Sequence, residues 1–241
     1  MKKYILLTIL PVFALFTNSC EEIDKITAGL TNDEIIEGLK SALNVGTDTS
    51  VNTLNAVDGY FKDELVKILL PPEASNLVNN ISKVPGLDLL VNEVVKSINR
   101  AAEDAAVEAK PIFVDAIKNI TITDGLSILN GEDDAATSYL SLNTSSQLTD
   151  AFSPKISTSL NKKLVGNVSA ESAYSSLINT YNQASLGGVL FKEIETNTLA
   201  EHTTKRALEG LFSKVAGEEF KIRNDLSHRV NDILKKVFGE Q

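Results

Sequence analysis

The chain has 241 residues, a formal net charge of −9 at pH 7 and a single cysteine. A chain of this length has one domain by default and can bury a sizeable core. Its acidic balance argues against nucleic-acid binding, because contacts to phosphate need Lys and Arg. The lone cysteine excludes an internal disulfide.

The N-terminus has the pattern of a secretory signal peptide. Lys2 and Lys3 are followed by a mostly apolar run over residues 4–16. This run is too short to span a bilayer as a helix, which needs about 20 residues, but it matches the apolar region of a signal peptide. We therefore expect residues 1–19 to be removed on export.

Cys20 lies just behind this run and is the expected lipidation site. In bacterial lipoproteins a thiol at this position takes up a diacylglycerol group, and the peptide bond before it is cut. Ser19 fits this cut site, whereas Thr17 stands where Leu is usual. The alternative is ordinary signal-peptidase cleavage, since Thr17 and Ser19 also fit a small-x-small site.

An anchor of two or more acyl chains at Cys20 is stable on a membrane. We expect residues 20–30 to form the lipidated tether and residues 31–241 a single α-helical domain. The expected location is the outer membrane, facing the periplasm, and a soluble periplasmic or secreted protein is the alternative. The choice between inner and outer membrane stays open, because sorting rules differ between bacteria.

The first part of the domain predicts helices separated by turns. Thr31 and Glu34 form a capping box at the start of a helix that extends to about residue 54. Residues 58–59, Asp-Gly, mark a turn. A short apolar helix is expected over residues 62–70, before a pair of prolines.

The longest apolar pattern keeps 3-and-4 spacing over residues 87–109 and continues, after Pro111, to residue 120. A proline in a helical pattern kinks or restarts the helix. The alanines of residues 101–109 allow a neighbouring helix to approach closely, so we predict a central bundle helix here. The alternative is a groove for an apolar ligand, for which the Gly187-Gly188 loop is the other indication.

Residues 124–140 are interpreted as the end of one helix, a break and the start of the next. Asn130 and Gly131 are expected to stop the first helix, because both tolerate the left-handed conformation. The acidic residues 132–134 then fall in the first turn of the second helix, where carboxylates interact favourably with the helix dipole. A cation site of these acids with Asp124 is the alternative, but it lacks the alternating ligands of a calcium-binding helix-loop-helix.

The second half of the chain also predicts helices. Thr144 and Gln147 offer another capping box, and helices over 169–181, 197–223 and 232–238 follow. No segment has convincing strand alternation. We therefore predict an all-α fold: an irregular multi-helix bundle of about eight to ten helices with no sheet.

Five blocks follow one another along the chain: GLKSALNVGTD (38–48), DGYFKDELVKILLPPEA (58–74), ILNGEDDAATSYL (128–140), residues 200–223 and DILKKVFG (232–239). Together they resemble a bacterial family described as domain of unknown function 4197. The resemblance implies an exported, mainly helical domain that is often a predicted lipoprotein. The family has no established activity, so it implies no catalytic residue. His202 stands where the family is expected to carry Tyr commonly, which weakens a catalytic role for this histidine.

The sequence contains no recognised catalytic or metal-binding motif. Its two histidines, His202 and His228, lie in neither an HExxH nor an ExxH pattern. There is no G-x-S-x-G elbow and no phosphate-binding glycine loop, and Cys20 is assigned to the anchor. We therefore predict no catalytic residue, no bound metal and no cofactor.

One polar cluster is a candidate site. The last long helix carries two pairs of polar side chains, each pair one turn apart, which face residues 124–140 if the two segments pack together. Such a cluster is either buried or able to orient a ligand, whereas the alternative is a solvated helix face with ordinary ion pairs. The candidate residues are Asp133, Thr137, His202, Arg206, Glu219 and Arg223.

These features predict a noncatalytic, lipid-anchored envelope protein that binds a protein or another envelope component or has a structural role. Its expected partners are the membrane, through the anchor, and an envelope protein, but no nucleic acid. One alternative is a carrier that holds an apolar small ligand between its helices. A second alternative is an enzyme that uses a polar cluster between residues 124–140 and 200–223.

Overall fold

The computed structural model describes residues 31–72, 74, 87–163, 168–184, 186, 188–189, 193, 198–229 and 232–238. These residues form eight α-helices and one 3-10 turn, with no strand among them, so the prediction of an all-α multi-helix bundle is confirmed. The expected signal peptide, Cys20 and Gly187 lie outside the described residues. The elements are α2 (Asn32–Asn55), α4 (Leu87–Ala106), α5 (Ala109–Lys118), α6 (Ile122–Leu129), α7 (Ala135–Leu160), α8 (Ala170–Ala184), α9 (Leu199–Asn224), η2 (Leu226–His228) and α10 (Asp232–Phe238).

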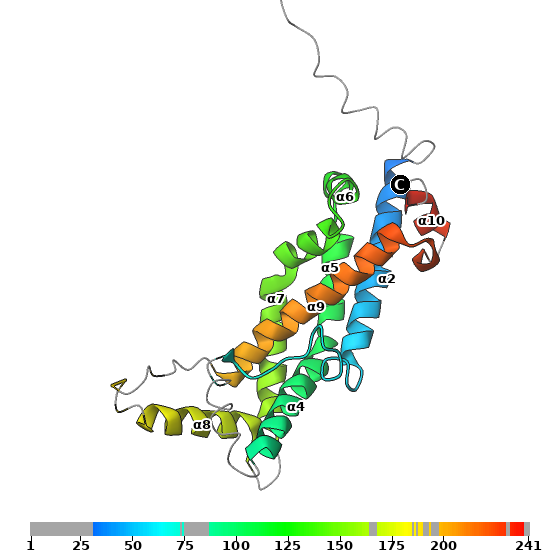
Figure 1. The fold of residues 1–241 in the computed structure, drawn as a ribbon. Coiled ribbons are helices and arrows are strands. Elements are labelled where there is room, and N and C mark those ends of the chain that lie inside the picture. Colours follow the sequence, from blue (N-terminus) through cyan, green and yellow to red (C-terminus); the bar gives the residue numbers. More distant parts are fainter. Residues whose placement is uncertain are drawn as a thin grey trace, which may run out of the picture.

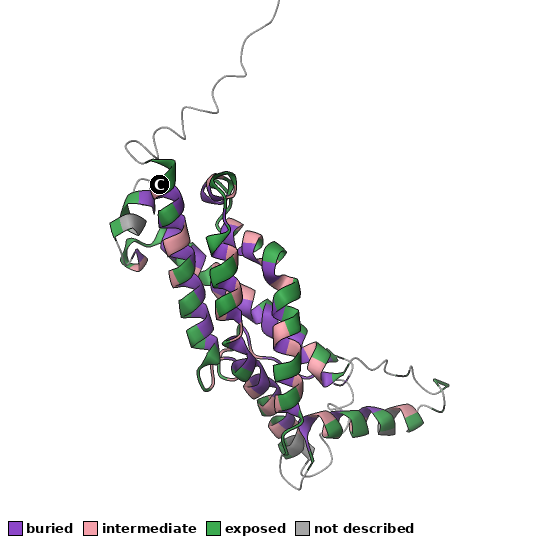
Figure 2. Ribbon diagram, turned by 180° about the vertical axis from the view of Figure 1, so that it is seen from behind, coloured by how far each residue is buried: buried purple, intermediate pink, exposed green. Residues whose placement is uncertain are grey.

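The helices form an elongated bundle with α9 as its main crossing element (Figure 1). This helix packs against α7, α2 and α4, while α5 fills the space between α2 and α7. At one end of the bundle α10 packs on α2, and at the other end α8 projects to the side (Figure 1). Buried residues line the surfaces where the long helices meet (Figure 2), so the core runs along the bundle axis.

The alanine-rich stretch lies at the centre of the bundle. Ala101, Ala102, Ala105 and Ala109 are fully buried, and α4 packs against α2, α7, α8 and α9. Their small side chains let these helices approach closely, as the sequence predicts. The restart expected at Pro111 occurs between α4 and α5: the proline lies in the first turn of α5, where its missing N–H costs no helical hydrogen bond.

Among the described residues, three helices begin with a complete capping box, in which a threonine hydroxyl and an acidic side chain exchange hydrogen bonds with each other's backbone. The pairs are Thr31 with Glu34, Thr121 with Asp124, and Thr198 with Glu201. The first of these confirms the helix start predicted at Thr31.

The capping box predicted at Thr144 is wrong. Helix α7 runs unbroken through this position, and Thr144 Oγ1 donates to the carbonyl of Leu140, one turn back, at 2.6 Å. A threonine hydroxyl can bond either to a free N–H at a helix start or to a carbonyl within the helix, and the sequence does not distinguish the two. Burial of Thr144 against the core favours the second.

The helix predicted over residues 62–70 is also wrong. Residues 56–70, which we call the strap, form turns and extended chain instead. The backbone N–H of Ile68 donates to Asn99 Oδ1, and Asn99 Nδ2 donates to the carbonyl of Ile68, both at 2.8 Å. A side chain of α4 therefore satisfies the polar backbone groups that a helix would satisfy internally.

Within the described residues, no helix combines the length and the apolar character needed to cross a membrane. The two 26-residue helices, α7 and α9, both carry polar faces.

Candidate functional site

Three of the six predicted polar residues meet at the corner between α6 and α7. Glu219 of α9 accepts hydrogen bonds from the backbone N–H groups of Ala136 and Thr137, at 2.9 and 2.8 Å, and from Thr137 Oγ1 at 2.8 Å. Arg223, one turn further along α9, donates to Glu219 Oε1 from both Nε and Nη2. Glu219 and Arg223 are each only 7 % exposed.

This ion pair also connects the ends of two helices. Arg223 donates to the carbonyls of Ile128 and Leu129, the last two residues of α6, while Glu219 occupies the N-terminus of α7. A cation at a helix C-terminus and an anion at a helix N-terminus both interact favourably with the helix dipoles. The pair thus supplies the bonds that the free backbone groups of this corner need.

The acidic residues 132–134 do not serve as the first turn of α7. The helix begins at Ala135, its N-cap residue Asp134 makes no capping hydrogen bond through its side chain, and residues 132–134 are exposed. Asp133 is therefore outside the corner, and the carboxylate at this helix start comes from α9. Asp124 belongs to the capping box with Thr121, whose hydroxyl and backbone N–H lower the pKa of its carboxyl group.

The break at residues 130–131 has a different cause from the expected one. Asn130 has φ −90°, and Gly131 does not adopt a positive φ. A Cβ placed on Gly131 would lie 2.5 Å from the Cβ of Ala135. The glycine is needed for the close approach of the turn to α7, rather than for a left-handed conformation.

His202 and Arg206 lie near the other end of α9, away from the corner. His202 Nε2 is 3.0 Å from the carbonyl of Leu69 in the strap. Arg206 pairs with Glu209 one turn along the exposed face of α9. The six predicted residues therefore fall into a buried group of three and three separate positions.

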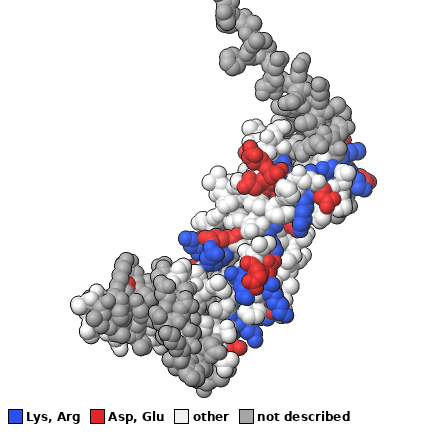
Figure 3. Space-filling model, viewed as in Figure 1, with Lys and Arg blue, Asp and Glu red and all other residues white. Residues whose placement is uncertain are grey.

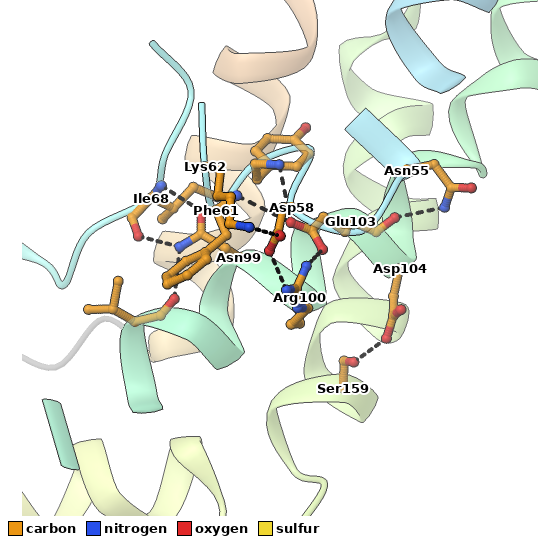
Figure 4. Close-up of polar contacts among 12 residues, drawn as sticks. Asn55, Asp58, Phe61, Lys62, Ile68, Asn99, Arg100, Glu103, Asp104 and Ser159 are labelled. Atoms are coloured by element: carbon orange, nitrogen blue, oxygen red, sulfur yellow. Dashed lines mark hydrogen bonds and ion pairs between the residues drawn. The ribbon is translucent and has the colours of Figure 1, made fainter. Parts of the chain in front are cut away.

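A second polar network, which the sequence did not predict, fixes the strap to α4 (Figure 4). Glu103 is 3 % exposed, and its Oε1 accepts from the backbone N–H groups of Tyr60 and Phe61 at 3.2 Å. Its other oxygen pairs with Arg100, which also bonds Asp58. Hydrogen bonds from Lys62 and Arg100 lower the pKa of Asp58.

The strap is held equally firmly on its other side by α9. The buried Tyr60 hydroxyl donates to the carbonyl of Ala207 at 2.8 Å, and burial together with the nearby Glu103 raises the pKa of this hydroxyl. Lys214 pairs with Asp63, and its hydrogen bond lowers the pKa of the Asp63 carboxyl group. These contacts bind the strap to both α4 and α9.

Replacing Glu103 with Ala is expected to lower the free energy of unfolding by about 2 kcal/mol, since two backbone donors and Arg100 lose their acceptor. Urea denaturation measures the loss, and faster amide exchange of Tyr60 and Phe61 locates it. Glu108→Ala, five residues further along the chain, is the control, because the surface ion pair of Glu108 with Lys155 contributes about 0–1 kcal/mol. Equal losses in the two variants would contradict this role of Glu103.

Two hollows in the described part of the chain lie beside residues of interest. One, of about 20 Å³, lies between α2, α9 and α10 beside the Glu219–Arg223 pair. It has room for about one water molecule. The other, of about 390 Å³, is an open groove between α7 and α9, which we call the α7/α9 groove. Its volume is in the range of ligand sites.

The α7/α9 groove has hydroxyl groups on both walls. On α7 the lining residues recur every fourth position, and on α9 the buried Thr204 has a hydroxyl group with no hydrogen-bond partner. Buried polar groups without a partner are rare in proteins. The groove is lined by Ser141, Ser145, Thr149 and Ser153 of α7 and by Glu201, Thr204, Lys205, Leu208, Glu209 and Phe212 of α9.

A family profile described as "Protein of unknown function (DUF4197)" matches residues 29–239. The chain belongs to the DUF4197 family. No curated protein and no solved structure matches the chain. Within the described residues of this DUF4197 domain, no group of three or more His, Cys, Asp or Glu side chains is placed to hold a metal ion.

Proposed function

We propose that this DUF4197 protein is a noncatalytic, lipid-anchored envelope protein that serves as a binding or structural module. The observation that carries the proposal is that Glu219 and Arg223 form their hydrogen bonds within the protein. Their hydrogen-bonding groups are directed at helix ends and at each other, which favours a bracing role over a chemical one. In the same way, Glu103 accepts hydrogen bonds from the backbone of the strap and pairs with Arg100.

The surface charge supports a partner other than nucleic acid. On the face shown in Figure 3, described basic and acidic side chains are interspersed. Several of the basic groups are paired with neighbouring carboxylates, as Lys221 is with Glu218. Together with the acidic net charge, this leaves little attraction for a phosphate backbone. The outer membrane facing the periplasm is the proposed location, reached through the lipid on Cys20.

The Cys20→Ala variant tests the anchor. Expressed with its N-terminus in a bacterial host, the wild-type protein is expected to incorporate labelled palmitate and to sediment with membranes. The variant is expected to lose both the label and the sedimentation, because the thiol is the acceptor of the diacylglycerol group. Glu21→Gln, which keeps the thiol, is the matched control. Label retained in Cys20→Ala would disprove lipidation at this residue.

The two alternative functions receive less support from the described residues. A carrier of an apolar ligand needs an enclosed cavity between helices, whereas the apolar hollow between α2, α9 and α10 has room for about one water molecule and the larger α7/α9 groove is open. The alanines of α4 are buried against other helices. An enzyme would use the polar cluster, but His202 and Arg206 are separate from Glu219 and Arg223.

A further inference from the structure

The α7/α9 groove is a long, two-walled site. Its hydroxyl-bearing residues on α7 run from Ser141 to Ser153 and are four residues apart. Because a helix rises 1.5 Å per residue, these residues follow one another about 6 Å apart along the wall, and the hydroxyl oxygens of Ser141 and Ser145 approach each other to 3.4 Å. The opposite wall runs from Glu201 to Phe212 over a similar length. Such a groove suits an extended ligand with repeated polar groups.

Two of the four hydroxyl groups on the α7 wall are oriented by their own helix. Ser145 Oγ donates to the carbonyl of Ser141 at 2.6 Å, and Thr149 Oγ1 donates to the carbonyl of Ser145 at 2.8 Å. With their protons used in this way, these oxygens have lone pairs left as acceptors. This wall therefore favours a ligand that donates hydrogen bonds.

The α9 wall adds groups of complementary character. Thr204 is 4 % exposed and its hydroxyl group can both donate and accept, although it does neither within the protein. Lys205 is exposed beside it and can only donate. A ligand that satisfies both walls must itself donate and accept, which is the property of a hydroxyl group.

Part of the lining of the groove is apolar. Leu208 and Phe212 line it, and Phe212 is held by an edge-to-face contact with Phe113, with ring centroids 6.1 Å apart. An aromatic ring fixed in this way offers a surface for the apolar face of a ligand. The charged lining groups are two glutamates, Glu201 and Glu209, and one lysine, Lys205, which together have a formal charge of −1. This balance disfavours an anionic ligand.

We propose that the α7/α9 groove binds an uncharged saccharide chain. Sugar rings have hydroxyl groups that donate and accept, and C–H faces that pack on apolar side chains such as Phe212. The hydroxyl group of Thr204, which is enclosed and without a partner in the free protein, turns toward a sugar hydroxyl group on binding, and Ser145 and Thr149 accept from successive positions along the chain. The proposal rests on the proposed function in that it names the ligand of the binding module. It does not depend on the lipid anchor.

The test uses the purified full chain in a detergent without a sugar headgroup, such as an amine oxide. Calorimetric titration with trimers of N-acetylglucosamine and of glucose is expected to detect binding of at least one trimer at millimolar concentration or below. Tri-alanine, a peptide that also donates and accepts hydrogen bonds, is expected not to bind. Absence of binding by both trimers, or binding of tri-alanine alone, would overturn the proposal.

Two variants locate the binding. Thr204→Val keeps the side-chain shape but removes the hydroxyl group, and loss of one hydrogen bond is expected to raise the Kd about fivefold. Ser145→Tyr fills the groove and is expected to abolish binding, while Ser146→Tyr, on the exposed face of α7, is expected to leave the Kd unchanged. Circular dichroism verifies that each variant is folded. An unchanged Kd in either groove variant would show that the sugar does not bind there. Because Cys20 is intact in all of them, membrane anchoring is unaffected by the result.

Discussion

The Glu219→Ala variant is expected to lose about 3–5 kcal/mol of unfolding free energy, the range for removing one partner of a buried ion pair. The substitution leaves the guanidinium group of Arg223 buried without its carboxylate. It also removes the acceptor of two N–H groups at the start of α7. Urea denaturation followed by far-ultraviolet circular dichroism measures the change.

Glu209→Ala is the matched control, because Glu209 is on the same helix but exposed and paired with Arg206. A surface pair of this kind contributes about 0–1 kcal/mol. The double variant Glu219→Leu with Arg223→Met removes both charges together, and its loss is expected to be smaller than the sum of the two single losses. If Glu219→Ala loses no more unfolding free energy than Glu209→Ala, the Glu219–Arg223 pair does not stabilise the corner between α6 and α7.

The Gly59→Ala variant is expected to lose about 3 kcal/mol, at the upper end of the usual cost of overpacking. A Cβ on Gly59 would lie 2.3 Å from the carbonyl oxygen of Thr53, 2.7 Å from that of Leu54 and 2.9 Å from that of Ala56. All three are backbone atoms at the end of α2, so they cannot rotate away as a side chain does. Either the turn into the strap or the end of α2 must move.

Gly217→Ala is the control for this substitution. Gly217 lies on the exposed face of α9, away from the helix ends, and an added Cβ there would meet no atom within 4 Å. Alanine is expected to stabilise the protein by about 0.5–1 kcal/mol at such a position, through its higher helix propensity. The two glycine substitutions should therefore shift the thermal midpoint in opposite directions. A shift of both in the same direction would refute the close approach at Gly59.

The sequence predicted the features that depend on neighbours along the chain. The capping box at Thr31, the buried alanines of α4 and the restart at Pro111 are set by spacing and by local backbone chemistry. The strap is different. Its apolar spacing allows a helix, but Asn99 and Glu103 of α4 bond its backbone in another conformation. No property of residues 62–70 alone indicates those partners.

The candidate site divides in the same way. The one-turn spacing of Glu219 and Arg223 predicted that they share a face of α9, whereas their contact with Thr137 depends on how two distant helices pack. Asp133 was included because it is close to Thr137 in sequence, but α7 begins only at Ala135. Glu103 was missed because Asp104 and Glu108 stand in the same run of alanines, and the sequence does not show which of the three carboxylates is buried. The groove was missed because its two walls come from different helices.

The corner between α6 and α7 also constrains the order in which the chain can fold. The bonds that complete it join residues 82 to 95 positions apart, since Glu219 reaches Thr137 and Arg223 reaches Ile128. Closing so long a loop is entropically costly, and contacts of high sequence separation slow folding. During synthesis, which proceeds from the N-terminus, the residues of α6 and α7 are present long before Glu219 and Arg223, whose side chains cap them. The hydrogen bonds that complete this corner can therefore form only when the last tenth of the polypeptide is present, whereas α2, α4 and α5, on which α6 and α7 also pack, precede them in the chain.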